Sequence, residues 1–179
     1  MKLPIIRTPN FNDLKDFYIN HLNFTLSEEL KESLRKVTLE HKVFQLVLEE
    51  GPGGFTPTEA KAPLGKEIEN AELVLYIPVP SATEYLNEVR NNGAHPLTEI
   101  LLQTPYADHS FEGFYIRDPD NNPLCFFTDG HGPYIPKFWD WCWEPKLTNE
   151  ILEKYQNITK RRVDLSLMAF LKKILNWFC

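Results

Sequence analysis

LVLYIPVPS, residues 73–81, runs from an apolar β-like segment through two prolines to a serine that suits a helix N-cap. Apolar residues at helical spacing follow over residues 82–92. LPIIRTPN at residues 3–10 repeats this order, and a second helical pattern follows it over residues 11–22. The chain is therefore predicted to build one unit twice, each copy reading strand, proline, cap, helix.

The ends of the two predicted helices carry matching signals. Ser81 with Glu84 three residues later forms a capping box, and Asn10 takes the equivalent place in the first copy. Gly93 is expected to close the second helix, and Asn23, the next best residue for a left-handed cap, is expected to close the first. These signals support the repeat independently of the apolar pattern.

Further β-like segments follow each helix, and they complete the predicted fold. DPDNNP at residues 118–123 is a dense turn signal and predicts a hairpin. The expected fold is α+β, with the order βαβββ occurring twice in paired modules that form an open cup-shaped sheet. The β-like segments are residues 35–40, 43–49, 97–103, 111–117 and 124–128.

A glycine and proline cluster, DGHGP at residues 129–133, marks the predicted domain boundary. Residues 1–130 form the predicted domain, with modules at about 1–65 and 70–130. Residues 131–179 form an extension, with an aromatic linker expected to pack onto the domain and two helices at 147–155 and 163–178.

Composition excludes several function classes. Apolar residues make up 42% of the 179 residues, which is enough to bury a core, and the net charge of −6 does not favour nucleic acid as a partner. Three widely spaced cysteines predict free thiols rather than a disulfide framework. We find no signal-peptide pattern and no membrane-spanning apolar run, so a cytoplasmic location is expected.

Two stretches resemble a known group. DLKDFYINHLNF at residues 13–24 and GFYIRDPDNNPL at residues 113–124 are similar to motifs of the vicinal oxygen chelate superfamily, which includes glyoxalases, bleomycin resistance proteins and extradiol dioxygenases. The resemblance covers residues 3–128. It implies two βαβββ modules curled into a cup that holds a small molecule and, in the enzymes, one divalent metal. It also implies a homodimer.

The metal ligands that this resemblance implies are not kept here. The histidine positions of the first strand in each module fall on Leu3 and Val74, the glutamate position of the second module falls on Cys125, and its counterpart in the first module lies near Gln45. Hydrocarbon side chains cannot bind a metal ion. No cofactor is therefore expected, unless displaced ligands form a site. The candidates for such a displaced site are His41, His109, Glu112 and Glu49.

Strand alternation from these positions predicts the lining of the cup. Arg7 and Tyr76 would be its orienting polar groups, and a flat or apolar small molecule would suit it. The same side chains could instead fill a closed core. The predicted lining residues are Leu3, Ile5, Arg7, Gln45, Val74, Tyr76, Cys125 and Phe127.

Three functions follow from these observations. The first is a metal-free small-molecule-binding protein of the bleomycin-resistance kind. The second is a divalent-metal-dependent lyase, isomerase or dioxygenase with displaced ligands. The third is contact with a partner or a membrane surface through residues 160–179, where basic residues precede and interrupt an amphipathic helical pattern.

Overall fold

The first module has the predicted order of elements. The computed structural model describes residues 3–30, 35–42, 44–56, 71–106, 109–129, 141–145, 148–150, 152–154, 156–157 and 160. The helix of this module continues from α1 into a wider π-type turn, η1, before the chain enters the sheet. The elements are β1 (Ile5–Thr8), α1 (Phe11–Asp16), η1 (Phe17–His21), β2 (Thr25–Leu30), β3 (Lys36–His41), β4 (Phe44–Glu50) and β5 (Gly54–Thr56).

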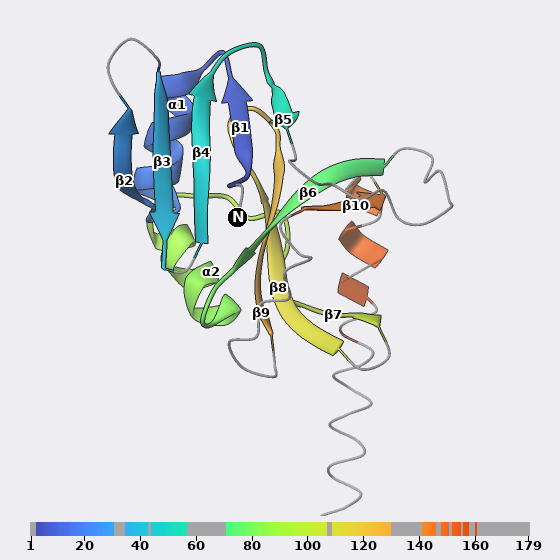
Figure 1. The fold of residues 1–179 in the computed structure, drawn as a ribbon. Helices are drawn as coiled ribbons and strands as arrows, with labels where there is room; N and C mark the ends of the chain where they lie inside the picture. Colours follow the sequence, from blue (N-terminus) through green and yellow to red (C-terminus); the bar gives the residue numbers. More distant parts are fainter. Residues whose placement is uncertain are drawn as a thin grey trace, which may run out of the picture.

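The second module repeats the first and adds a strand from the C-terminal extension. The first sheet has the order β2-β3-β4-β1-β5, and the second has the order β10-β6-β9-β8-β7 (Figure 1). In each sheet the first strand of the module pairs in parallel with its last strand, β1 with β4 and β6 with β9. The prediction of an α+β fold with paired βαβββ-like modules is confirmed. The elements are β6 (Ala71–Pro78), α2 (Ala82–Asn91), β7 (Leu101–Tyr106), β8 (His109–Arg117), β9 (Pro123–Asp129) and β10 (Trp141–Pro145).

Most of the predicted helix caps are confirmed. The Ser81 hydroxyl accepts a hydrogen bond from the Glu84 backbone N–H at 3.2 Å, and both Gly93 and Asn23 have positive φ, at 82° and 51°. Asn10 is the N-cap residue of α1, as predicted, but its side chain makes no capping hydrogen bond there. Its amide donates instead to Asp120, in the hairpin of the other module.

Strand β2 was not among the predicted segments. Its sequence, TLSEEL, is mostly polar, as is common for a strand at the edge of a sheet. Strand β7 begins at Leu101, four residues after the predicted start at Leu97.

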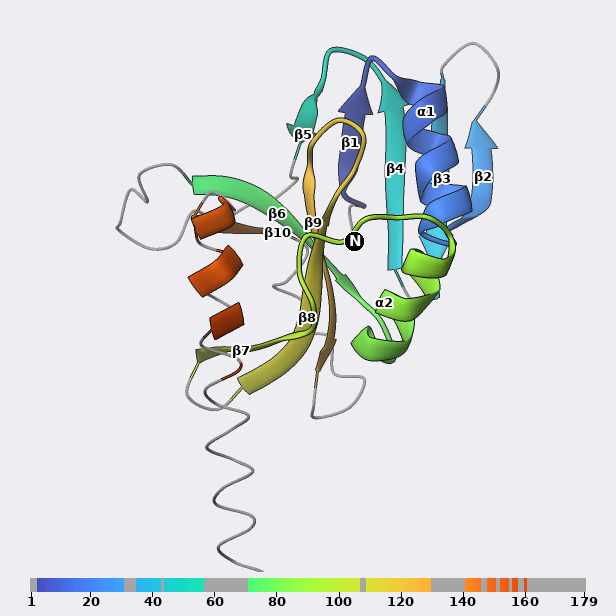
Figure 2. The same cartoon turned by 180° about the vertical axis from the view of Figure 1, so that it is seen from behind.

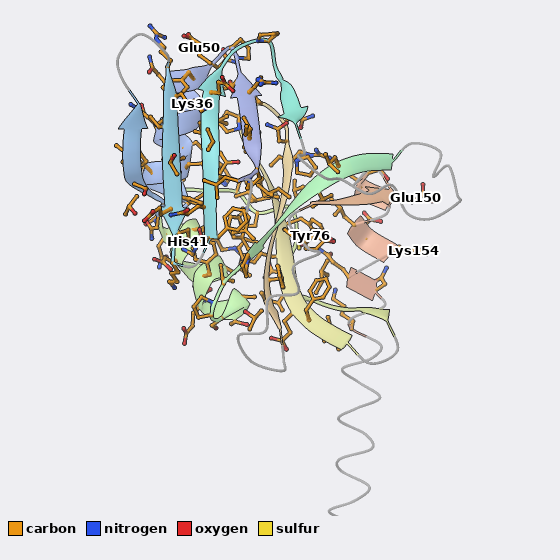
Figure 3. All side chains as sticks on the ribbon, viewed as in Figure 1. Lys36, His41, Glu50, Tyr76, Glu150 and Lys154 are labelled. Atoms are coloured by element: carbon orange, nitrogen blue, oxygen red, sulfur yellow. The ribbon has the colours of Figure 1, made fainter. Side chains whose placement is uncertain are left out.

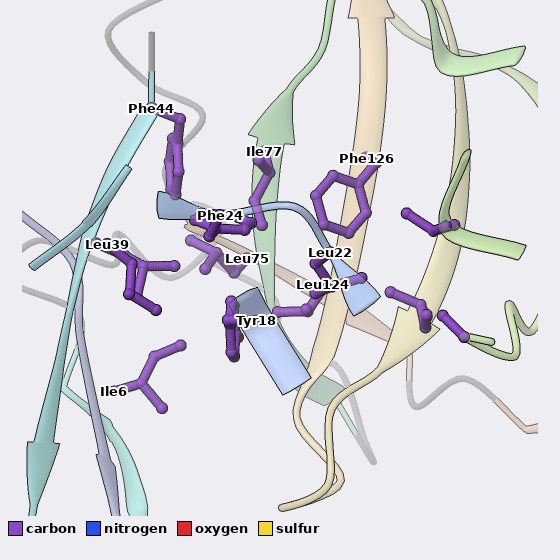
Figure 4. Packing of buried hydrophobic residues seen from close by; sticks show 14 of the residues in the cluster. Ile6, Tyr18, Leu22, Phe24, Leu39, Phe44, Leu75, Ile77, Leu124 and Phe126 are labelled. Carbon is purple, nitrogen blue, oxygen red and sulfur yellow. The ribbon is translucent and has the colours of Figure 1, made fainter. Parts of the chain in front are cut away.

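The two sheets enclose one apolar core, which we call the shared core (Figure 4). Both helices lie in this core, so the inward side chains of both sheets pack against the same layer. Its fully buried members include Ile6, Leu39 and Leu48 from the first sheet and Leu75, Leu124 and Phe126 from the second, with Leu14, Tyr18, Leu22 and Val89 from the helices.

Polar contacts join the modules at the edge of the shared core. The Tyr18 hydroxyl donates to Asp118 at 3.4 Å, and the Tyr85 hydroxyl donates to the backbone carbonyl of Leu22. Asp118 also accepts bonds from the backbone and side-chain amide of Asn122, each at 2.8 Å, which fixes the hairpin turn. The two modules are therefore held together by hydrogen bonds as well as by apolar packing.

The C-terminal extension joins the second sheet directly. Strand β10 pairs antiparallel with β6 along five residues, from Trp141 opposite Leu75 to Pro145 opposite Ala71. Helical positions follow between residues 149 and 160 (Figure 2). The predicted helix at 163–178 lies outside the described residues, so membrane or partner contact through residues 160–179 stays a prediction. Within the described part of the chain, no helix is long and apolar enough to cross a membrane.

Candidate functional site

Each sheet has an outer face, opposite the shared core, and the two outer faces occupy equivalent places in the repeat. Ile5 pairs with Val47 in the first sheet, as Tyr76 pairs with Cys125 in the second. Because side chains alternate along a strand, the residues two positions away share each face. The first outer face carries Ile5, Arg7, Lys36, Thr38, Glu40, Gln45, Val47 and Glu49. The second carries Val74, Tyr76, Leu101, Phe111, Tyr115, Cys125 and Phe127.

The predicted lining residues are divided between these two faces. Leu3, Ile5, Arg7 and Gln45 belong to the first module, and each remains partly or fully exposed. Val74, Tyr76, Cys125 and Phe127 lie together in a buried cluster of the second module. The eight residues therefore do not share one concave face within the chain, because the helices lie between the two sheets and the outer faces point away from that common layer.

The first outer face is polar. Arg7 and Glu49 form an ion pair at 3.3 Å, and the Gln45 amide donates to Glu40 on the neighbouring strand. Lys36 lies directly opposite Glu49 in the register. These partly exposed charges are paired across strands and well hydrated, so they satisfy one another rather than converge on a common point.

The second outer face is aromatic and closed. Tyr76, Phe111 and Phe127 contact one another edge to face, with ring centroids 5.5 to 6.0 Å apart. The hydroxyls of Tyr76 and Tyr115 are 3.3 Å apart, within hydrogen-bond distance, and Cys125 beside them is fully buried. Leu152 of the C-terminal segment packs into this cluster, and Leu97 packs against its margin. Figure 3 shows Tyr76 on this sheet, with Glu150 and Lys154 on the segment beside it.

The residues at the four positions expected to ligate a metal are not suited to bind a metal ion. The sheet register makes Val47, two residues after Gln45, the counterpart of Cys125, so the four positions hold Leu3, Val47, Val74 and Cys125. Three of these are hydrocarbon side chains, and a single buried thiol cannot hold a divalent ion in place of a His and Glu set.

The displaced candidates do not converge either. His41 points into the shared core between the rings of Phe24 and Tyr85, whereas Glu49 is paired with Arg7 on the opposite face of the same sheet. Glu112 is exposed on β8, and the side chain of His109 lies outside the described residues. Among the described residues, no three His, Cys, Asp or Glu side chains are grouped closely enough to hold a metal ion.

His41 is a structural residue of the core. Burial lowers its pKa to about 4, so the imidazole is neutral near pH 7. Within the described part of the chain, its Nδ1 atom makes no hydrogen bond. Its ring contributes chiefly by contact with the two neighbouring aromatic rings.

Sequence reasoning did not single out Tyr115, Phe111 or Leu152. The first two could have been found, because residues 111–117 alternate and place 111, 113 and 115 on one face of the strand. Leu152 could not, because nothing local indicates which surface a separate helical segment will cover.

The arrangement resembles that of several solved structures. No family model and no curated protein matches the sequence. A glyoxalase/bleomycin resistance protein/dioxygenase from Alicyclobacillus acidocaldarius is 17% identical, with a TM-score of 0.47, and the match covers 70% of this chain and 88% of that one. A second protein of that description, from Nocardioides, is also 17% identical, with a TM-score of 0.45 and coverage of 72% and 82%.

A protein from the mobile metagenome of V. Pseudocholerae is 17% identical, with a TM-score of 0.49 and coverage of 69% and 89%. At these identities the likeness concerns the fold alone. The structural neighbours of this chain include glyoxalase/bleomycin resistance/dioxygenase proteins that align with about 70% of it.

Proposed function

We propose that this chain is a metal-free small-molecule-binding protein whose ligand binds against the second outer face. The observation that carries the proposal is the pair of tyrosine hydroxyls, Tyr76 and Tyr115, 3.3 Å apart within a cluster of aromatic and aliphatic side chains. Binding sites for small molecules typically combine an apolar lining with a few placed polar groups. The first outer face, with its paired and hydrated charges, offers no comparable surface.

The composition of the second outer face indicates the class of ligand. Its aromatic rings provide a large apolar area, and the two phenol groups can donate or accept one directed hydrogen bond. The described members of the cluster carry no charged side chain, so none of them could offset the lost hydration of an ionised ligand. The ligand is therefore a flat, uncharged aromatic molecule with one hydrogen-bonding group.

Binding does not depend on a divalent ion in this proposal. The support is the chemistry of the four positions where the superfamily resemblance implies ligands, which here hold Leu3, Val47, Val74 and Cys125. The enzyme alternative would require His41, His109, Glu112 and Glu49 to act together, and the first of these lies in the shared core.

Thermal melting with 2-naphthol tests the proposal. This probe is flat and uncharged and has one hydroxyl, whereas 2-naphthoic acid has the same rings and a carboxylate. We expect 2-naphthol to raise the melting temperature and the acid to leave it unchanged. Tyr76→Phe should weaken the affinity for 2-naphthol about fivefold, since one hydrogen bond contributes about 1 kcal/mol.

Arg7→Ala is the matched control for this experiment. Arg7 is the other polar group predicted from the sequence, but it lies on the first outer face beside Glu49. Its replacement should leave 2-naphthol binding unchanged, and so should EDTA. Equal stabilisation of wild type and Tyr76→Phe, or loss of stabilisation with EDTA, would overturn the proposal.

A further inference from the structure

The C-terminal segment lies on the surface where we place the ligand. Its first part, β10, extends the second sheet by pairing with β6, and helical positions between residues 149 and 160 follow beside the same sheet (Figures 1 and 2). Leu152 is 7% exposed and belongs to the cluster of Tyr76, Cys125 and Phe127. This side chain is therefore part of what buries the second outer face.

The described side chains of the segment that are buried or half-buried lie on one side of it. Glu150, Glu153 and Lys154 are exposed, whereas Leu152 is buried and Gln156, four residues later and thus on the same side of a helix, is half-buried. Among the described residues from 148 to 160, Leu152 is the only buried side chain. Most of the described side chains of this segment are exposed, and an exposed surface element opens at a lower free-energy cost than a buried sheet.

We propose that the C-terminal segment, described at residues 148–150, 152–154 and 156–157, forms a cover over the second outer face, and that Leu152 and the ligand compete for the same aromatic surface. This inference rests on the proposed function for its physiological meaning. When the cover is closed, Leu152 occupies apolar surface of the cluster that contains Tyr76 and Cys125; when it opens, that surface becomes available to the ligand. The apparent affinity for the ligand is then reduced by the fraction of molecules in which the cover is closed.

Cys125 reports the opening of the cover without any ligand. Its side chain is fully buried in the cluster that Leu152 completes, so a water-soluble thiol reagent reaches it only when that cluster opens. The rate of labelling by 5,5′-dithiobis(2-nitrobenzoate) is measured in the full chain carrying Cys142→Ser and Cys179→Ser, which leaves Cys125 as its one cysteine.

Leu152→Ala should accelerate labelling of Cys125 about tenfold or more, because it removes the buried contact that holds the segment down. Leu152→Val should give a smaller acceleration, which keeps the test usable if the larger truncation disturbs folding. Glu153→Ala is the matched control, because Glu153 follows Leu152 directly and its side chain is exposed. This substitution should leave the rate of Cys125 labelling unchanged.

A second control separates opening of the cover from global unfolding. Val89→Ala creates a cavity in the shared core, on the other side of the second sheet, and should lower the melting temperature without accelerating labelling under native conditions. The proposed cover would be wrong if Cys125 were labelled no faster in Leu152→Ala than in Glu153→Ala. It would also be wrong if Val89→Ala accelerated labelling as much as Leu152→Ala does.

Titration with 2-naphthol then connects the cover to the ligand. Leu152→Ala should bind 2-naphthol more tightly than wild type does, because the cover is closed in a smaller fraction of the variant's molecules. If Leu152→Ala accelerates labelling but no variant binds 2-naphthol, the cover stands and the proposed function fails. If wild type binds 2-naphthol but Leu152→Ala does not accelerate labelling, the proposed function stands and the cover fails.

Discussion

The two outer faces have the same backbone register but opposite chemistry. At the centre of the first, Val47 lies between Ile5 and Thr38 on its neighbouring strands; at the equivalent place in the second, Cys125 lies between Tyr76 and Tyr115. The βαβββ unit therefore fixes where these side chains lie without fixing what they do.

The difference continues toward the ends of the strands. Glu49 of the first face is paired with Arg7, whereas its counterpart in the second face, Phe127, packs against Tyr76 and Phe111. A face with paired charges can remain against water, but an aromatic face of this size needs something to cover it. Leu152 of the C-terminal segment meets part of this need, because it packs into the aromatic cluster.

Replacing Phe127 and Glu49 by alanine tests this comparison with the largest expected effect. Phe127→Ala should lower the free energy of unfolding by about 4 kcal/mol, because it leaves a cavity in a closed aromatic cluster. Glu49→Ala should cost less than about 0.5 kcal/mol, because its ion pair is partly exposed to solvent. Urea unfolding of both variants measures the difference, and equal losses would show that the two faces are buried alike.

Asp118 provides a test of the junction that both modules share. Burial raises the pKa of its carboxyl from 3.8 to about 6, despite the hydrogen bonds from Asn122. The folded state thus holds this proton more tightly than the unfolded state, so the contribution to stability is complete below pH 4 and is lost as the pH rises toward 6.

Comparison with Asp118→Asn isolates that contribution from the other carboxyl groups. The free energy of unfolding of wild type, relative to the variant, should fall by up to about 3 kcal/mol between pH 4 and pH 6, and should change little above pH 7. Urea unfolding at a series of pH values measures it. Parallel curves for the two proteins would contradict burial of this carboxylate between the modules.

Gly113 and Lys36 are a further pair of equivalent positions, opposite Phe127 and Glu49 respectively. A Cβ atom at Gly113 would lie 2.8 Å from the backbone oxygen of Phe126 and 3.2 Å from the Phe127 Cβ, so Gly113→Ala should cost about 2 kcal/mol. Lys36→Ala should change stability by less than about 0.5 kcal/mol. Thermal unfolding of both variants measures these changes. Equal losses of stability in the two variants would show that the second outer face is no more tightly packed than the first.

The repeated module could be predicted from the sequence because its signals are local. The Ser81 cap, the left-handed Gly93 and the turn at residues 118–123 each depend on a few neighbouring residues. Strand β2 escaped prediction because an edge strand needs no apolar alternation.

The candidate site could be predicted only in part. Alternation correctly placed Tyr76, Cys125 and Phe127 on one face of the second sheet. It could not show that the helices of both modules would fill the space between the sheets and so separate these residues from Arg7, because that depends on contacts between residues far apart in the chain. The covering role of Leu152 depends on the same kind of long-range packing.

Calorimetric titration with 2-naphthol before and after dialysis against EDTA, with metal content measured on the same samples by plasma mass spectrometry, tests the central claim most directly. The account predicts far less than one metal ion per chain and the same affinity in both samples. Near-stoichiometric metal before dialysis, together with loss of binding after it, would contradict a metal-free binding site on the second outer face.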